Sequence, residues 1–280
     1  KKRIEFKKIN LNHLLFLISN KKYIMSAINQ GNVVISINDR GIATIEFSHP
    51  MSNSLPAKVL SKLSKTITQA GENPKVKVII LKSAGDRVFC AGASFEELSS
   101  IDSLAKGEEF FSGFANVINA ARKCPKLIIG RVQGKAVGGG VGMASAVDYC
   151  FATKYAAVKL SELALGIGPF VVGPAVARKT GLSSMSMMAI NATKWFSADW
   201  AKNVGLFADV FETAEQMDEK IIELSNKLAS SNPAAMENLK KVLWEGTENW
   251  DNLLSNRAKI SGELVLSTFS KNAINALKKV

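Results

Sequence analysis

Hydrophobic and polar positions alternate in short blocks along the first part of the chain. VVISI at 33–37 and IATIEF at 42–47 are rich in β-branched residues and flank NDRG, a sequence typical of a tight turn, so they predict a β-hairpin. Apolar residues then recur every three or four positions, as on one face of a helix that ends near Gly71 and Pro74. These apolar positions are Leu55, Val59, Leu60, Leu63 and Ile67.

Continuous apolar runs alternate with helical patterns further along the chain. VKVIILKS (76–83), LIIGRV (127–132) and VDYCFAT (147–153) read as buried strands. The apolar face of a helix lies between the first two, at Phe110, Phe111, Phe114, Val117 and Ile118. Strand–helix alternation predicts an α/β fold. After about residue 182 the segments read as amphipathic helices, which we expect to pack on the protein's own core or on a neighbouring subunit.

Composition changes this picture mainly at the N-terminus. The 280 residues are 47% hydrophobic, enough for a full core, and no apolar run reaches the roughly 18 residues of a membrane span. The formal net charge is +12, but residues 1–24 supply half of it. Because Met25 opens a start-like sequence, we interpret 1–24 as an extension outside the fold, with a targeting segment as the alternative. The mildly basic remainder argues against nucleic acid as a partner and suits a phosphate-bearing ligand.

The cysteines and histidines exclude several kinds of site. The odd number of cysteines, in apolar surroundings, indicates free thiols in a reducing compartment, so we expect a cytoplasmic protein; they are Cys90, Cys124 and Cys150. His13 and His49 are the two histidines. We interpret His49, before Pro50, as a surface or capping residue. A metal site or a Ser-His-Asp triad is therefore not expected.

Two glycine-centred loops follow predicted strands directly. The first is DRVFCAGASFEEL at 86–98, and the second is GKAVGGGVGMA at 134–144. Ligands commonly bind where a strand gives way to a helix in an α/β fold, and small residues let backbone N–H groups approach them. Two such N–H groups can converge on one carbonyl oxygen and form an oxyanion hole. Ordinary tight turns are the alternative interpretation.

One acidic residue stands out in the segment AAVKLSELALGIGPFVVGPAV (156–176). Glu162 lies inside an apolar run bounded by glycines. Burying a carboxylate is costly unless it has a partner or a function. Burial would raise its pKa towards neutrality, which suits a general acid/base. A capping or salt-bridged glutamate is the alternative.

The combined motifs carry a resemblance. FCAGASFEEL, KLIIGRVQGKAVGGGVGMASAVDYCFAT and AAVKLSELALGIGP, in this order and spacing, resemble the crotonase superfamily, the enoyl-CoA hydratase/isomerase family. The resemblance covers roughly residues 30–275. It implies a crotonase-like spiral of ββα units over 25–205 and a mainly helical oligomerisation region over 206–280. It also implies a homotrimer or hexamer, no membrane association, and an acyl-CoA thioester substrate with no cofactor besides the CoA within that substrate.

The resemblance also assigns site residues by position. The N–H groups of Ala93 and Gly139 should bind the thioester oxygen, and Glu162 should be the acid/base. Glycine at 139 would let the thioester lie against its N–H. Phe95, Phe111 and Trp195 are candidates for the acyl pocket, with core packing the preferred role for each. The residues expected to contact substrate are Ala91, Gly92, Phe95, Gly138, Gly140, Gly142 and Phe170.

The chain departs from the family's pattern at three points. The family's hydratases use two glutamates, and the first of these positions is Gly142 here. Ser94 stands where an Asp is usual, and IGPFVVGPAV (167–176) replaces a more glycine-rich segment, so Phe170 is expected to narrow the pocket. With one carboxylate, isomerisation, hydration and decarboxylation all remain open. A non-catalytic acyl-CoA-binding protein is a further alternative, against which the retained Glu162 argues.

Overall fold

The computed structural model describes residues 30–277 and arranges their strands in two larger sheets and one short pair. The expected extension at 1–24 lies outside the described residues. The six-stranded sheet has the order β1-β2-β4-β7-β9-β12 and is parallel except at the β1–β2 hairpin. Its strands are β1 (Asn32–Ile37), β2 (Ile42–Ser48), β4 (Val78–Ser83), β7 (Leu127–Val132), β9 (Tyr149–Thr153) and β12 (Asp209–Phe211).

The second sheet is smaller and carries the glycine-centred loops. Its order is β11-β10-β8-β5, parallel except at β10–β11. Its strands are β5 (Val88–Cys90), β8 (Lys135–Val137), β10 (Ala157–Lys159) and β11 (Phe196–Ser197), and a separate parallel pair consists of β3 (Ser54–Leu55) and β6 (Gly92–Ala93).

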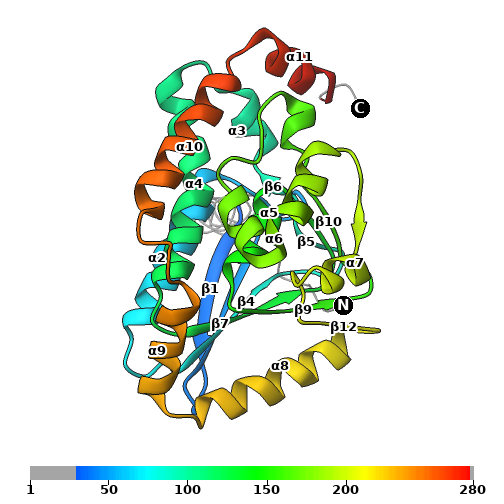
Figure 1. The fold of residues 1–280 in the computed structure, drawn as a ribbon. Coiled ribbons are helices and arrows are strands. Elements are labelled where there is room, and N and C mark those ends of the chain that lie inside the picture. Colours follow the sequence, from blue (N-terminus) through cyan, green and yellow to red (C-terminus); the bar gives the residue numbers. More distant parts are fainter. Residues whose placement is uncertain (1–29, 278–280) are drawn as a thin grey trace, which may run out of the picture.

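The chain visits the sheets in turn, which makes the fold a spiral (Figure 1). Successive circuits run β2–β3–α2, β4–β5–α4, β7–β8–α5 and β9–β10–α6, so each adds a strand to the large sheet, a strand to a smaller one and a helix. The expected ββα spiral is thus confirmed. The helices of these circuits are α2 (Ala57–Glu72), α4 (Leu104–Lys123), α5 (Gly139–Ala146) and α6 (Gly173–Ile190). Two short helices precede α4 and α6, namely α3 (Phe95–Ser99) and the 3₁₀ helix η1 (Glu162–Leu165).

The sequence of β4 is largely apolar because the strand is buried on both of its faces. Ile79 and Leu81 face the main core, which α2 and α4 cover, whereas Val78 and Ile80 face a second cluster beneath α8 (Ala214–Ala229). A sheet covered on both faces needs apolar residues at successive positions rather than at alternate ones. The predicted helix at α2 begins later than expected, because Leu55 belongs to β3 and Pro56 caps the helix.

The C-terminal region is mainly helical and is joined closely to the rest. Its helices from residue 198 are α7 (Ala198–Asn203), α8, α9 (Pro233–Leu243), α10 (Trp250–Leu264) and α11 (Thr268–Leu277). β12 completes the large sheet, and α10 lies along α4 (Figure 1). A Cβ added to Gly107 would stand 2.8 Å from the Cα of Gly262, so glycines allow this crossing. No helix among residues 30–277 is long and apolar enough to cross a membrane.

Candidate active site

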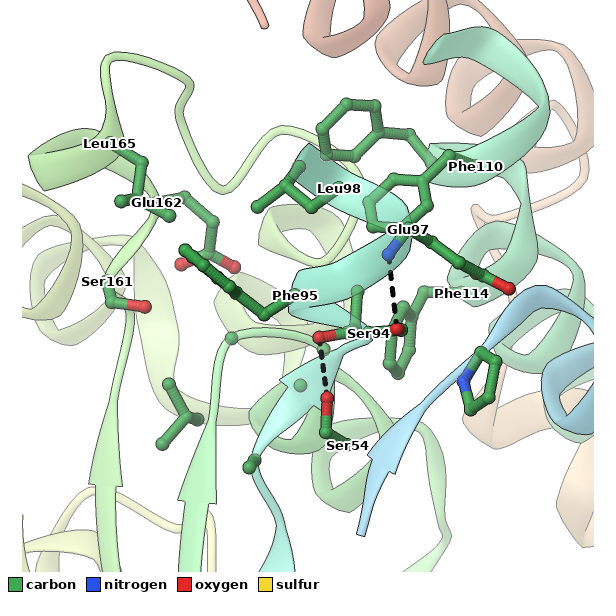
Figure 2. A pocket seen from close by; sticks show the side chains of 18 of the residues that line it. Ser54, Ser94, Phe95, Glu97, Leu98, Phe110, Phe114, Ser161, Glu162 and Leu165 are labelled. Atoms are coloured by element: carbon green, nitrogen blue, oxygen red, sulfur yellow. Dashed lines mark hydrogen bonds between the residues drawn. The ribbon is translucent and has the colours of Figure 1, made fainter. Parts of the chain in front are cut away.

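A cavity of about 1310 Å³ opens where the second sheet meets α3, α4 and η1 (Figure 2). Its apolar lining comes mainly from Phe95, Leu98, Phe110, Phe111, Phe114, Val137, Leu165, Ile167, Val171 and Val172. The ionisable side chains among its described lining residues are His49, Lys58, Glu96, Glu97 and Glu162. Such an apolar cleft with few polar groups is typical of a small-molecule site.

The cavity brings together most of the site residues that the sequence suggested. The residues that line it are Ala91, Gly92, Ala93, Phe95, Gly138, Gly139 and Glu162. Three others are not among its lining residues: Gly140, Gly142 and Phe170. The two glycine loops and the acidic segment therefore converge, although they lie far apart in the sequence.

The backbone around Ala93 is held in place by its pairing with β3. β6 pairs with β3, and the N–H of Ser94 donates to the carbonyl of Leu55 at 3.0 Å. Alternate residues of a parallel strand direct their N–H groups to its partner, so the N–H of Ala93 points to the opposite side. The Ser54 hydroxyl holds the same segment by donating to the Ala93 carbonyl at 2.9 Å. Ser94, where the family has Asp, caps α3 by accepting from the N–H of Glu97.

The second N–H group lies at the start of α5. Gly139 is the first residue of this helix, and N–H groups in a first turn have no carbonyl partner within the helix. Gly138 precedes it with φ +51°, a conformation that favours glycine. A Cβ built on Gly92 would stand 3.9 Å from the Gly139 nitrogen, so the two loops meet. The segment that carries Ala93 and the start of α5 therefore lie next to each other at the cavity.

The side chain of Phe114 gives Gly139 a further reason to be glycine. A Cβ at Gly139 would lie 2.3 Å from the Phe114 ring, which therefore packs directly on the loop. Sequence reasoning assigned Phe114 only to a helix face, yet it lines the cavity. A Cβ at Gly140 would meet the Cys90 carbonyl oxygen at 2.6 Å. Gly140 thus serves the packing of α5 against β5.

Glu162 begins η1 and reaches the cavity beside the second loop (Figure 2). A Cβ on Gly138 would lie 2.8 Å from Glu162 Oε1, so the carboxylate comes close because Gly138 has no side chain. Although the residue as a whole is only half-buried, its Oε2 is buried and has no hydrogen-bond partner within residues 30–277. Burial raises the pKa of this carboxyl from 4.5 to about 7. A group that titrates near neutrality can accept a proton and return it.

The other carboxylates on the cavity wall are placed differently. Glu97 Oε2 accepts a hydrogen bond from the N–H of Ala57 at 2.8 Å and so caps α2. Glu96 is exposed. His49 accepts from the N–H of Met51 through Nδ1, as a residue that caps a turn would. Glu162 is therefore the carboxylate that lies against the second glycine loop.

The structure does not bring Gly142 to the cavity. A Cβ at this position would lie 2.5 Å from Cγ1 and 2.8 Å from Cβ of Val172, which itself lines the cavity. Val172 thus occupies the space that a side chain at 142 would enter. The first of the family's two glutamate positions is filled with hydrocarbon from another segment, which sequence inspection could not show.

Two aromatic residues also lie away from the cavity. Phe170 packs over Gly168, where an added Cβ would be 2.5 Å from its ring, so its neighbours Val171 and Val172 line the cavity instead. Trp195 lies under Lys135 and Lys159, whose Nζ atoms stand 5.1 and 4.5 Å from its ring centre. Phe170 therefore does not narrow the cavity as expected, and Trp195, for which core packing was the preferred role, is 38% exposed and belongs neither to the core nor to the cavity lining.

Comparison with known proteins agrees with this geometry. Residues 38–277 match the family described as enoyl-CoA hydratase/isomerase. The chain belongs to this family. It is 30% identical to the mitochondrial methylglutaconyl-CoA hydratase of Mus musculus over 75% of this chain and 68% of that protein. It is 26% identical to the peroxisomal Delta(3,5)-Delta(2,4)-dienoyl-CoA isomerase of Arabidopsis thaliana over 70% and 74% of the respective chains.

The fold of the family is matched as well. The crystal structure of enoyl-CoA hydratase from Bacillus halodurans superposes with a TM-score of 0.80 at 22% identity, covering 87% of this chain and 99% of that one. Membership in the crotonase superfamily and the α/β class are confirmed. So is the expectation of an enzyme of the hydratase or isomerase kind.

Proposed function

We propose that this protein moves a double bond within an enoyl-CoA thioester, with Glu162 as the acid/base. The N–H groups of Ala93 and Gly139 would bind the thioester oxygen. The observation that carries the proposal is the buried, unpartnered Oε2 of Glu162 beside the loop that presents Gly139. A base at that place can act on carbons next to a carbonyl held by the two N–H groups.

The reaction needs one base and no second reactant. Glu162 takes a proton from C2 of a 3-enoyl thioester, and the electron pair moves onto the thioester oxygen to give a dienolate. The two N–H groups stabilise this developing charge, and the first turn of α5 adds partial positive charge. Glu162 then returns the proton at C4, which yields the 2-enoyl thioester. Atoms and electrons balance without water or a redox partner.

Hydration is the second candidate, and Ser161 is the residue that favours it. Water addition requires a group that holds the water, and the Gly142 position is closed by Val172. The cavity wall next to Glu162 nevertheless includes Ser161, whose hydroxyl could hold water instead. Relatives named as a hydratase and as an isomerase cover both reactions.

A substrate screen separates these reactions. We would incubate the protein with 3-enoyl-CoA and 2-enoyl-CoA thioesters and resolve the products by chromatography. Isomerisation without 3-hydroxyacyl-CoA supports the proposal. Efficient hydration that is lost in Ser161→Ala would replace it by the second candidate. No turnover with any thioester would contradict both and favour acyl-CoA binding alone.

The charged residues that line the cavity indicate which kind of acyl group it can accept. Among its described lining residues Lys58 is the one lysine or arginine, and it is exposed and bonded to Gln30 Oε1 at 3.2 Å. A substrate carboxylate buried without a cationic partner would be costly. We therefore propose an uncharged hydrocarbon acyl group. A faster rate with a glutaconyl-CoA than with the matching enoyl-CoA would contradict this.

We also propose that the protein assembles as a homotrimer or hexamer. Leu182 and Ile190 on α6 are each 75% exposed, and Met187 between them is 49% exposed. Apolar side chains clustered on a helix surface favour association with another chain. Light scattering should report three or six chains, and a monomer at micromolar concentration would contradict the proposal.

A further inference from the structure

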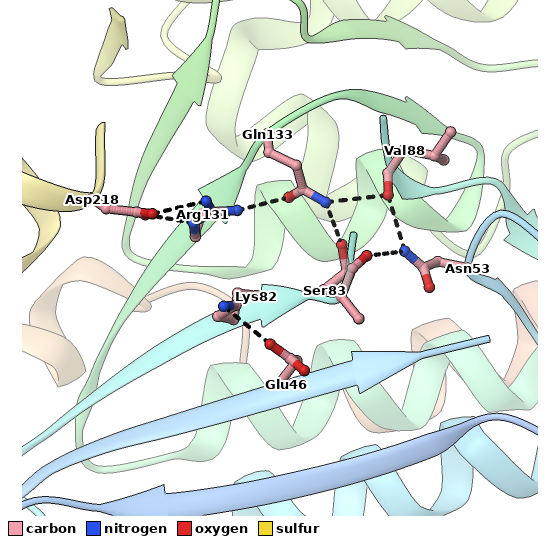
Figure 3. A network of polar contacts seen from close by, with 9 residues as sticks. Glu46, Asn53, Lys82, Ser83, Val88, Arg131, Gln133 and Asp218 are labelled. Atoms are coloured by element: carbon pink, nitrogen blue, oxygen red, sulfur yellow. Dashed lines mark hydrogen bonds and ion pairs between the residues drawn. The ribbon is translucent and has the colours of Figure 1, made fainter. Parts of the chain in front are cut away.

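Two buried side-chain amides meet at one backbone oxygen (Figure 3). Asn53 Nδ2 donates to the carbonyl oxygen of Val88 at 2.9 Å, and Gln133 Nε2 donates to the same oxygen at 3.2 Å. Asn53 is 6% exposed and Gln133 is 2% exposed, so solvent can scarcely replace these bonds. Since Val88 opens β5, one oxygen joins three segments that are distant in the sequence.

The Asn53 side of this junction leads to Ala93. Asn53 has φ +54°, and its N–H and Oδ1 close the turn by bonding to the backbone of His49. The next residue, Ser54, donates its hydroxyl to the Ala93 carbonyl, and β3 pairs with β6 along the same two residues. The position of Asn53 relative to β5 therefore determines where the Ala93 peptide lies.

The Gln133 side leads to Gly139. Gln133 stands between β7 and β8, and β8 runs directly into Gly138 and Gly139. The start of β8 is held against the residue before Val88, because the N–H of Lys135 donates to the Arg87 carbonyl at 3.3 Å. A Cβ on Gly134 would lie 2.2 Å from that same oxygen, so the approach is close.

The remaining hydrogen bonds fix how both amides are oriented. The second Nδ2 hydrogen of Asn53 goes to the Ala84 carbonyl at 2.9 Å. Gln133 Nε2 also donates to Ser83 Oγ at 2.9 Å, while its Oε1 accepts from Arg131, which is paired with Asp218 on α8 (Figure 3). An amide flip would place oxygen against oxygen. Each amide must therefore present its nitrogen to Val88.

We propose that Asn53 and Gln133 are positioning residues, which through the shared Val88 oxygen set the spacing between the N–H groups of Ala93 and Gly139. The inference rests on the proposed function, because it assumes that these N–H groups bind the thioester oxygen. Neither side chain touches substrate. Asn53 and Gln133 instead fix the starts of the two segments that lead to Ala93 and Gly139, whose N–H groups are proposed to bind the thioester oxygen.

Breaking the junction should slow the chemical step more than it weakens binding. Loss of one oxyanion donor costs about 10²–10³-fold in kcat, and a displacement of about 1 Å can cost about 10²-fold. A junction loosened on one side should therefore lower kcat about 10-fold to 100-fold. KM should change little, since the rest of the cavity still holds the CoA thioester.

Asn53→Gly and Gln133→Met test the inference. Glycine keeps the positive φ at position 53, and methionine keeps the length of the side chain at 133. Ser83→Ala is the matched control, because it removes one bond of the same network and leaves both contacts to Val88. For each folded variant we would measure kcat, KM and the melting temperature. The near-ultraviolet absorption of bound acetoacetyl-CoA would report its enolate, whose charged oxygen is the group that the two N–H groups should hold.

The inference predicts a lower kcat and a weaker enolate signal in both variants, and neither change in Ser83→Ala. The double variant should lose less than the product of the single losses, because both changes loosen one junction. A lower melting temperature with kcat and the enolate signal intact would overturn the inference. If Asn53→Gly does not fold, the measurements on Gln133→Met alone test it. If the wild type shows no enolate signal, the proposed function fails and the inference fails with it.

Discussion

Asp148 and Glu162 are both buried carboxylates, but their surroundings differ in almost every respect. Asp148 accepts hydrogen bonds from Lys240 Nζ at 2.6 Å, Trp244 Nε1 at 2.9 Å and the N–H of Ile128 at 2.8 Å. Glu162 Oε2 has no such partner in the part of the chain that the structure describes. One carboxylate joins α9 to the large sheet, and the other faces the cavity.

The two carboxylates also differ in how their charge is compensated. The charge of Asp148 is compensated inside the protein by Lys240, whose side chain is 2% exposed. The charge of Glu162 is not compensated, so burial raises the pKa of its carboxyl to about 7. Three hydrogen-bond donors thus surround the carboxylate that joins α9 to the large sheet, whereas Oε2 of the carboxylate at the cavity has none within residues 30–277.

The largest effect should come from Glu162→Gln. Glutamine keeps the shape of the side chain and removes the proton acceptor, so kcat should fall about 10²–10⁴-fold, the usual contribution of a positioned general base. Affinity for a CoA thioester, measured by calorimetry, should change little. Full activity of the variant on every accepted substrate would show that the base is elsewhere.

Asp148→Asn should lower the stability of the protein and leave its kcat unchanged. It leaves Lys240 buried without its carboxylate, and breaking a buried pair in this way costs about 3–5 kcal/mol of unfolding free energy. The kcat of the protein that remains folded should be unchanged. In Asp148→Asn with Lys240→Met the uncompensated charge is gone, and denaturant unfolding should show part of the stability restored. Wild-type stability in the single variant would contradict the structural role.

The stability that Glu162 contributes should also depend on pH. The pKa of Glu162 is raised in the folded state, from 4.5 to about 7. The folded protein therefore holds this proton more tightly, and the stability that Glu162 contributes is present below pH about 4.5 and lost as pH rises through about 7. Glu162→Gln does not titrate there, so it should gain stability over the wild type between these values. Thermal unfolding at pH 5 and pH 8 measures the difference, and an equal gain at both would contradict the raised pKa.

A second carboxylate, introduced at position 142, should add a group that can hold water beside Glu162. Gly142→Glu alone should clash with Val172 and lower the melting temperature. Gly142→Glu combined with Val172→Gly removes that contact and should gain hydration of a 2-enoyl-CoA. Val172→Gly by itself is the control. Hydration by the control at the rate of the double variant would show that space, rather than the carboxylate, was missing.

The smallest effect is expected for Phe170→Leu. Phe170 packs over Gly168 and does not line the cavity. The relative rates for short and long acyl chains should therefore match those of the wild type. If the variant clearly prefers longer acyl chains, Phe170 must line the pocket after all.

Much of this organisation was predictable from the sequence because it depends on local patterns. The hairpin β1–β2, the strand β7 and the apolar face of α2 follow directly from hydrophobic spacing. Glu162 was identifiable because a charged residue in an apolar run is unusual. The short strands β5, β8 and β10 were not identified, since three residues carry no periodicity.

The rest depends on contacts between distant segments. That Val172 fills the space beside Gly142, and that Phe114 packs on Gly139, follows from how α4, α5 and α6 pack together. Phe170 was expected in the pocket because the segment 167–176 replaces a more glycine-rich segment of the family. The turn before α6 instead directs Val171 and Val172 to the cavity and Phe170 away from it.

The role proposed for Glu162 can be tested by the exchange of the C2 hydrogens of butyryl-CoA with deuterium from solvent. This exchange needs the base and the oxygen site but no double bond, so it does not depend on knowing the natural substrate. We expect mass spectrometry to show exchange by the wild type and a rate about 10²–10⁴-fold lower in Glu162→Gln. Exchange at the wild-type rate in that variant would contradict the assignment of Glu162 as the group that moves the proton.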